Sequence, residues 1–183
     1  MTQERSLVQI ALFAALIAAL GLIPPLALGF GVPITAQSLG IMLCGTVLGA
    51  RRGGLAALLF IALVALGLPL LSGGRGGLGL FVSPTVGFLI GFPVAAFVTG
   101  YVMERLANLQ AVLAAGVAAV VGGVFVLYAF GIVGMSVALD KTLVEAALLV
   151  TAFIPGDLVK AALAALITAA VYRARPDSVL SRA

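Results

Sequence analysis

The sequence predicts an all-α, polytopic membrane protein with six transmembrane helices. Of its 183 residues, 63% are hydrophobic and only 9% are charged, and the mean hydropathy is +1.32. A soluble domain cannot bury so much apolar surface and still keep a wettable exterior. Four stretches contain no charged residue, and each is long enough for a helix of ~20 residues, which crosses a ~30 Å hydrocarbon core. These stretches are residues 6–50, 53–74, 76–103 and 106–139.

Proline and glycine residues divide the apolar chain into the six spans. The first span ends before Pro24-Pro25, because proline removes helix hydrogen bonds and disfavours helix just ahead of it. Residues 51–54, with sequence RRGG, are predicted to form a tight basic turn after the second span. Pro155 is expected to open the sixth span, with Asp157 in its first turn near the positive end of the helix dipole. The other expected elements are spans at residues 7–22, 35–50, 55–71, 85–106 and 109–132, and a short outer helix at residues 142–152.

The charged residues predict the orientation, because cytoplasmic loops carry an excess of lysine and arginine. With both termini in the cytoplasm, the outer loops hold only Arg75 and Lys141. We therefore expect residues 1–183 to form one multi-pass domain of the cytoplasmic membrane. The loop after the first span, the Gly-rich loop and the start of the sixth span then meet on the outer side, where they predict an outward-facing pocket. The inner segments hold Arg5, Arg51, Arg52, Arg105, Arg173, Arg175 and Arg182.

Asp157 and Lys160 are the strongest candidates for a functional site. They lie three residues apart in FIPGDLVKAALAALITAAVY, so both side chains point to one face of the helix. A charged side chain at bilayer depth costs about 2.5–3.5 kcal/mol on insertion scales, and such residues usually face a partner, a cavity or a substrate. The pair predicts a site for a ligand with both hydrogen-bond donors and acceptors. The alternative is a structural ion pair whose members only neutralise each other.

The segment SGGRGGLGLFVSP is a second candidate for ligand contact. Gly74, Gly76 and Gly77 allow the backbone to approach a ligand closely, and the Arg75 guanidinium group has a fork of donors that matches a carboxylate. The segment lacks the order GxxxxGK[ST] and follows no strand, which argues against ATP binding. The alternatives are a flexible connector for the loop and contact with lipid headgroups for Arg75.

Other classes of function find little support in the residue types. The chain has no histidine, so imidazole metal sites and histidine-based triads are excluded, and no metal or cofactor is expected. The single cysteine, Cys44, cannot form an intramolecular disulfide. Positive charges lie at the ends of apolar runs, which argues against nucleic-acid binding. An intramembrane Ser/Lys hydrolase is disfavoured because GxSxG and HExxH are absent, and only folding can bring Ser72 or Ser83 to Lys160.

Three segments resemble a known family. VPITAQSLG, the Gly-rich loop running into LFVSPTVGFLIGF, and FIPGDLVKAALAA together resemble the BioY biotin transporters. These are the membrane-embedded substrate-binding (S) components of energy-coupling factor (ECF) transporters. The resemblance covers nearly the whole chain, and PGDLVK and GG-x-GG…F-x-x-PT-x-GF are its specific parts. Val86 stands where the family commonly has glycine, which bears on how closely the backbone there approaches the ligand.

The resemblance implies six helices, a vitamin pocket near the outer surface and uptake of biotin as the transported ligand. It also gives meaning to Ala11, Ala15 and Ala19, whose small-xxx-small spacing lets another helix approach closely in lipid. In the family, the alanine-rich first helix meets a transmembrane coupling subunit that two ATPase subunits drive. The sequence is compatible with three modes of action: the protein works alone, as a homo-oligomer, or only with the coupling subunits. An S component for another vitamin, thiamine or riboflavin, is the alternative, although cationic thiamine favours an acidic, aromatic pocket.

The chemistry of biotin matches the candidate residues. Its urea head has two N–H donors and one carbonyl acceptor, and its valerate tail ends in a carboxylate. Asp157 is expected to accept from the urea N–H groups, Lys160 to donate to the carbonyl and Arg75 to pair with the carboxylate. The remaining expected contacts are the apolar walls and the polar groups between them: Phe30, Phe81, Tyr128, Gln37, Thr35, Thr85, Gly74, Gly76 and Gly77.

Overall fold

The computed structural model describes residues 3–182 and confirms the all-α class. Within this part of the chain there is no β-strand, and only two isolated β-bridges pair Leu26 with Ile34 and Leu71 with Arg75. The α-helices are α1 (Gln3–Leu20), α2 (Gln37–Leu48), α3 (Ala50–Ala65), α4 (Val86–Arg105), α5 (Ala111–Val120), α6 (Leu127–Ala138), α7 (Leu143–Val150) and α8 (Ile154–Ala174). The short elements are η1 (Leu78–Val82), η2 (Val121–Val126), η3 (Thr151–Phe153), η4 (Pro176–Ser178) and η5 (Leu180–Arg182).

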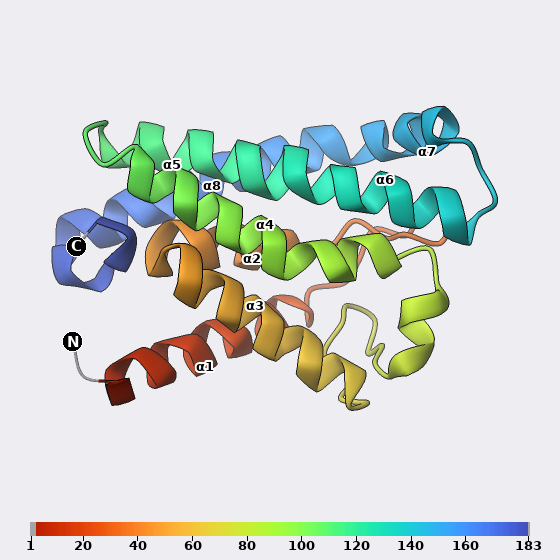
Figure 1. Ribbon diagram of the computed structural model, residues 1–183, viewed down its shortest axis with the longest axis horizontal. Helices are drawn as coiled ribbons and strands as arrows, with labels where there is room; N and C mark the ends of the chain where they lie inside the picture. Colours follow the sequence, from red (N-terminus) through yellow and green to blue (C-terminus); the bar gives the residue numbers. More distant parts are fainter. Residues whose placement is uncertain (1–2, 183) are drawn as a thin grey trace.

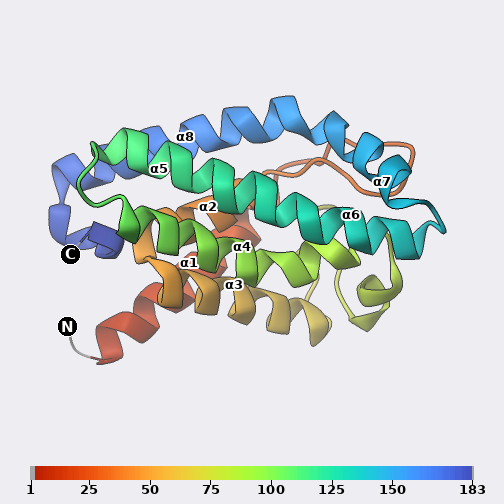
Figure 2. The same cartoon turned by 45° about the horizontal axis from the view of Figure 1, so that its top comes forward.

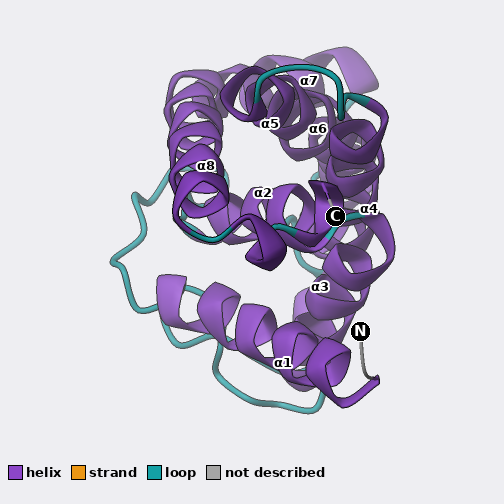
Figure 3. Ribbon diagram, turned by 90° about the vertical axis from the view of Figure 1, so that its left-hand side faces the viewer, coloured by secondary structure: helices purple, strands orange, loops and turns teal. Residues whose placement is uncertain are grey.

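The long helices run side by side along the longest axis of the molecule (Figure 1). The two ends of the chain lie at one end of this bundle, where α4 also passes into α5. The loops before α2, before α4 and before α7 lie toward the other end (Figures 1 and 2). Seen from the end that holds the termini, α1 lies at the edge of the bundle, where it packs against α2 and α3 (Figure 3). The three predicted outer segments therefore gather at one end.

The turn between α2 and α3 lies before residues 51–54, where the sequence analysis had placed it. Gly49 adopts φ +83°, a left-handed conformation that glycine enters without steric cost, and it alone separates the two helices. The predicted basic turn at residues 51–54 is wrong, because these residues form the first turn of α3. Their glycines serve packing instead: a Cβ added to Gly53 would lie 2.6 Å from the carbonyl oxygen of Cys44.

Two span ends also differ from the prediction. Helix α3 ends at Ala65, earlier than expected, and the chain turns at Gly67 with φ +100°. Helices α5 and α6 form one stretch, Ala111–Ala138, that continues past the predicted end at residue 132. A π-helical turn, η2, joins them. A Cβ added to Gly122 in this turn would lie 2.6 Å from the carbonyl oxygen of Ala95, so a glycine here allows α4 to approach closely.

The last apolar region divides as predicted into a short helix and a long one. Thr142 caps α7: its backbone N–H donates to Glu145 Oε2 at 2.9 Å, and its hydroxyl oxygen accepts from the Glu145 N–H at 3.3 Å. Helix α8 begins at Ile154 with Pro155 in its first turn, where a missing N–H leaves no helix hydrogen bond unmade. The structure confirms that Asp157 lies in the first turn of α8, where the helix dipole favours a carboxylate.

Among the described residues, three helical stretches are long and apolar enough to cross a membrane: Val86–Arg105, Ala111–Ala138 and Leu143–Ala174. Helices α2 and α3 have 12 and 16 residues, fewer than the ~20 of an ordinary span. The membrane class of the chain agrees with these stretches, and the count of six spans stays a prediction.

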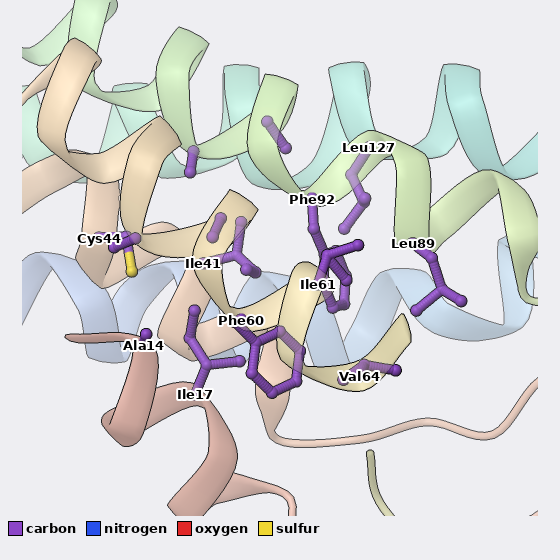
Figure 4. Packing of buried hydrophobic residues seen from close by; sticks show 14 of the residues in the cluster. Ala14, Ile17, Ile41, Cys44, Phe60, Ile61, Val64, Leu89, Phe92 and Leu127 are labelled. Carbon is purple, nitrogen blue, oxygen red and sulfur yellow. The ribbon is translucent and has the colours of Figure 1, made fainter. Parts of the chain in front are cut away.

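Helix α1 has one face in the protein core and another at the surface. Figure 4 shows the buried cluster between α1, α2, α3 and α4, to which α1 contributes Ala14 and Ile17. These two residues are 3% and 0% exposed. Ala11, Ala15 and Ala19 are exposed instead. The small-residue face that the sequence predicts for close helix approach is therefore accessible.

Candidate functional site

A cavity lies between the segment that leads into α2, the loop before η1, helix α4 and the junction of α7 with α8. Its volume is about 70 Å³, which is below the ~300–1,000 Å³ typical of ligand pockets. Apolar side chains line most of it, as expected for a ligand that is largely apolar. The apolar lining is Val32, Pro33, Ile34, Leu71, Phe88, Leu89, Phe92, Leu127 and Phe153, and the polar lining is Thr35, Gln37, Ser38, Arg75, Thr85, Asp157 and Lys160.

Asp157 is the centre of a buried hydrogen-bond network in this lining. Its Oδ1 atom accepts from Lys160 Nζ at 2.8 Å and from Ser38 Oγ at 3.1 Å. Its Oδ2 atom accepts from the Tyr128 hydroxyl at 2.8 Å. Lys160 Nζ also donates to Ser38 Oγ at 3.0 Å. Side chains from α2, α6 and α8 therefore fix the position of the carboxylate, whose residue is only 5% exposed.

The network leaves one acceptor and one donor unused. A carboxylate oxygen can accept about two hydrogen bonds, and an ammonium group has three N–H donors. Among the described residues, Asp157 Oδ2 has one partner and Lys160 Nζ has two. Both side chains lie in the cavity lining, with 7% and 14% of their surface exposed. A ligand that presents an N–H next to a carbonyl oxygen can satisfy both groups at once.

Arg75 reaches the cavity from a tightly folded turn. Leu71 and Arg75 exchange two backbone hydrogen bonds of 3.0 and 3.2 Å, and Gly73 and Gly74 between them adopt φ +81° and +70°. Arg75 Nε donates to the carbonyl oxygen of Ser72 at 3.2 Å. Its two terminal nitrogens have no hydrogen-bond partner within residues 3–182. The loop is thus an ordered turn, and it presents free guanidinium donors to the cavity.

The structure brings half of the predicted binding residues into the cavity lining. These are Asp157, Lys160, Arg75, Thr85, Gln37 and Thr35. The other predicted residues lie behind the lining or outside it: Phe30, Phe81, Tyr128, Gly74, Gly76 and Gly77.

The residues outside the lining have other contacts. Tyr128 holds Asp157 through its hydroxyl group and contributes no wall to the cavity. Phe30 packs edge-on against Phe153, with 5.9 Å between the ring centroids. Phe81 packs against the core shared by α1 to α4. A Cβ added to Gly76 would collide with the backbone around residue 68, so this glycine allows the loop to fold closely upon itself.

Ten of the sixteen lining residues were missed by the sequence analysis, and four of these ten are polar or aromatic. Ser38 follows Gln37 in VPITAQSLG, but an uncharged serine in an apolar helix gives no signal of its own. Phe88 and Phe92 are four residues apart, a spacing that puts both on one face of α4. Phe153 lies next to Phe88, with 5.7 Å between their centroids. The spacing of the two phenylalanines in FLIGF was a usable signal for an aromatic wall.

Val86, which departs from the resembled pattern, does not line the cavity. It lies in a separate surface groove between α4 and α6, with Gly87 and Phe130 among its neighbours. The larger side chain at this position therefore leaves the cavity unchanged.

The site offers little for hydrolysis or for metal chemistry. Ser38 is the serine that meets Lys160, whereas Ser72 and Ser83 donate to backbone carbonyl groups elsewhere. Lys160 is ion-paired with Asp157 at 2.8 Å, and a charged ammonium group has no lone pair with which to accept a proton. Within residues 3–182, no group of three His, Cys, Asp or Glu side chains gathers to hold a metal ion.

Comparison with known proteins decides the family. The profile of the BioY family matches residues 1–177. The chain belongs to the BioY family. Two relatives named biotin transporter BioY are similar over nearly their whole length. The protein from Rhodobacter capsulatus is 52% identical over 98% of this chain and 99% of the relative, and that from Rhizobium etli is 54% identical over 94% and 95%.

A solved structure has the same fold. The crystal structure of the S-component for biotin from an ECF-type ABC transporter matches this chain with a TM-score of 0.88 and 31% identity, over 94% of this chain and 95% of that one. The S-component architecture expected from the sequence is thus confirmed. BioY proteins are membrane transporters and not enzymes, which removes the hydrolase alternative.

Proposed function

We propose that this protein binds biotin in the cavity beside α8 and takes part in biotin uptake as a substrate-binding component. The observation that carries the proposal is the Asp157–Lys160 network, which leaves one acceptor and one donor at the cavity surface. A cyclic urea carries the complementary N–H and C=O groups side by side. The biotin transporter names of the two relatives support the same ligand.

The urea head of biotin lies against the start of α8 in this proposal. Asp157 Oδ2 accepts one urea N–H, and Lys160 Nζ donates its third N–H to the urea carbonyl. Hydrogen bonds with one charged partner are the stronger kind, and a dry cavity strengthens them further. Ser38 and Tyr128 already fix the carboxylate, so binding requires little ordering of these side chains.

The rings and tail of biotin lie along the apolar lining. Phe88, Phe92 and Phe153 form the aromatic wall. The sequence had predicted this wall from Phe30, Phe81 and Tyr128. Arg75 pairs with the carboxylate at the end of the tail, because its fork of donors matches the two oxygen atoms. Thr35 and Thr85 supply hydroxyl groups, and Gly74, Gly76 and Gly77 shape the turn that carries Arg75.

The partners and orientation are also part of the proposal. The loops around the cavity lie at the opposite end from the termini (Figure 1), and the bias of arginine toward the terminal end favours termini in the cytoplasm. The cavity then faces outward. The solved neighbour is an S-component of an ECF-type transporter. We therefore expect a coupling subunit to contact the exposed face of Ala11, Ala15 and Ala19, with ATPase subunits driving transport.

Equilibrium binding of labelled biotin to the purified protein in detergent tests the proposal. We expect saturable binding near one site per chain that unlabelled biotin displaces and that thiamine and riboflavin do not. Displacement by either of these vitamins, or absence of binding by a folded sample, would reject biotin as the ligand.

A further inference from the structure

The side-chain amide of Gln37 joins three segments of the chain at the rim of the cavity. Its Nε2 atom donates to the carbonyl oxygens of Ile17 in α1 and Leu70 in the loop before η1, both at 3.1 Å. Its Oε1 atom accepts from the backbone N–H of Ser72 at 3.0 Å. The two carbonyl acceptors identify one end of the amide as Nε2, and the N–H donor identifies the other end as Oε1. Both N–H donors of the Gln37 side-chain amide are thus in use.

The segment that Gln37 holds is the one that carries Arg75. Ser72 is anchored twice, by its N–H on Gln37 and by its hydroxyl group, which donates to the carbonyl oxygen of Ile23 at 3.0 Å. The carbonyl oxygen of Ser72 in turn accepts from Arg75 Nε. A continuous chain of hydrogen bonds therefore runs from Gln37 through Ser72 to the guanidinium group.

The packing around Gln37 is close. Gln37 and Ser72 are each only 1% exposed. A Cβ added to Gly21 would lie 2.5 Å from the Leu70 carbonyl oxygen and 2.9 Å from Gln37 Nε2. The end of α1 can approach the loop only because residue 21 has no side chain. Loss of the amide removes the partner of the Ser72 N–H.

We infer that Gln37 is a positioning residue for Arg75 and not a contact to the ligand. With both donors spent on the backbone, Gln37 has no N–H left to offer a bound molecule, although it lies in the cavity lining. Its role is to hold the turn in place before the ligand arrives, so that Arg75 does not have to be ordered on binding. The inference rests on the proposed function, because it takes the ligand to be biotin and the partner of Arg75 to be the biotin carboxylate.

The inference separates the two ends of the ligand. A displaced Arg75 weakens the contact with the carboxylate and leaves the urea contacts with Asp157 and Lys160 intact. Biotin and biotinol, in which a primary alcohol replaces the carboxylate, differ only at that end. The ratio of their dissociation constants therefore reports on Arg75, whereas general damage to the fold weakens both ligands alike.

The experiment measures this ratio for the wild-type protein and for Gln37→Met, Arg75→Met and the double variant, by titration calorimetry in detergent. Thr46→Val is the matched control: Thr46 is also buried in α2, and its hydroxyl bonds with that of Thr168 at 2.8 Å. We expect Gln37→Met to weaken biotin about tenfold, the loss of roughly one hydrogen bond to a charged group. We expect the affinity for biotinol to stay unchanged. In the Arg75→Met background, Gln37→Met should cause no further loss of biotin affinity.

Hydrogen exchange of the unliganded wild-type protein gives a second reading that needs no variant to fold. We expect the Ser72 and Arg75 amides to be protected before ligand is added, because the Ser72 N–H donates to Gln37 Oε1 and the Arg75 N–H donates to the Leu71 carbonyl oxygen. Exchange of these amides at the rate of an unstructured peptide would overturn the inference.

The binding results distinguish failure of the inference from failure of the proposed function. Equal weakening of biotin and biotinol by Gln37→Met, or additive losses in the double variant, would overturn the positioning role and leave biotin as the ligand. Wild-type protein that binds biotin and biotinol equally well would overturn the role of Arg75 and this inference together. Wild-type protein that binds neither ligand would reject the proposed function itself.

Discussion

Substitution of Asp157 and Lys160 separates a ligand site from a structural ion pair. Asp157→Asn removes the charge from a carboxylate that accepts three hydrogen bonds, one of them from the Lys160 ammonium group at 2.8 Å. Hydrogen bonds to charged groups contribute about 1.5–3 kcal/mol each. At 1.4 kcal/mol per factor of ten, loss of the urea contact alone lowers biotin affinity about 10- to 150-fold. Lys160→Met removes the donor to the urea carbonyl and is expected to act in the same range.

Each single variant also leaves a buried charge without its partner, which destabilises a fold by about 3–5 kcal/mol. Thermal stability and biotin binding are therefore measured on the same samples, by a melting curve and by titration calorimetry. The double variant Asp157→Asn with Lys160→Met removes both charges and should regain much of the lost stability. If the pair binds the ligand, the double variant folds and still does not bind biotin.

Thr168→Val is the matched control on the same helix. Thr168 is fully buried in α8 and its hydroxyl bonds with that of Thr46 at 2.8 Å, so the variant loses a buried hydrogen bond away from the cavity. We expect a small loss of stability and unchanged biotin affinity. Biotin binding that recovers in the Asp157/Lys160 double variant would refute the ligand role and leave only the structural ion pair.

Three further predictions follow from the site and its surroundings. Ser38→Ala should weaken biotin severalfold, as measured by calorimetry, because Asp157 and Lys160 each lose one of the bonds that orient them. Ala15→Leu should abolish uptake of labelled biotin in cells with the coupling subunits while the purified variant binds normally, because bulk blocks close helix approach. In a Cys44→Ala background, Lys141→Cys should react with an impermeant thiol reagent in intact spheroplasts, and Arg175→Cys should react only after lysis.

Each of these predictions has an outcome that contradicts it. Unchanged affinity in Ser38→Ala would mean that Tyr128 alone suffices to orient the pair. Normal uptake by Ala15→Leu would exclude the alanine face as a docking surface. Labelling at residue 175 and not at residue 141 in intact cells would invert the topology and turn the cavity inward.

The polar pair could be predicted from the sequence because charge is rare in an apolar chain. Asp157 and Lys160 stand out in a span of alanine and leucine, and their spacing fixes a common face. Arg75 stands out for the same reason among glycines. Ser38 could not be found in this way, since a serine costs little in a helix and its role depends on the packing of α2 against α8.

The errors in the fold have a similar origin. The chain turns at Gly49 and not within residues 51–54, because one glycine with positive φ suffices for a tight reversal and the glycines beyond it are needed for close packing. Gln37 was predicted to contact the ligand because it is polar and lies at the start of the second span. Only the structure reveals that its amide is bonded to the backbone on both sides, through two carbonyl oxygens and one N–H group that no pattern of side chains can indicate.

The central claim is that the Asp157–Lys160 pair recognises a urea through one acceptor and one donor, and 2-iminobiotin tests it most directly. This analogue keeps the rings and tail of biotin, but in its protonated form a cyclic guanidinium group with no acceptor replaces the urea. Calorimetric titration of the wild-type protein should find iminobiotin at least about 100-fold weaker than biotin, because the donor of Lys160 then faces a donor and a like charge. The same titration of Lys160→Met should find a much smaller difference between the affinities for biotin and iminobiotin. Equal affinity of the wild-type protein for the two ligands would contradict the account.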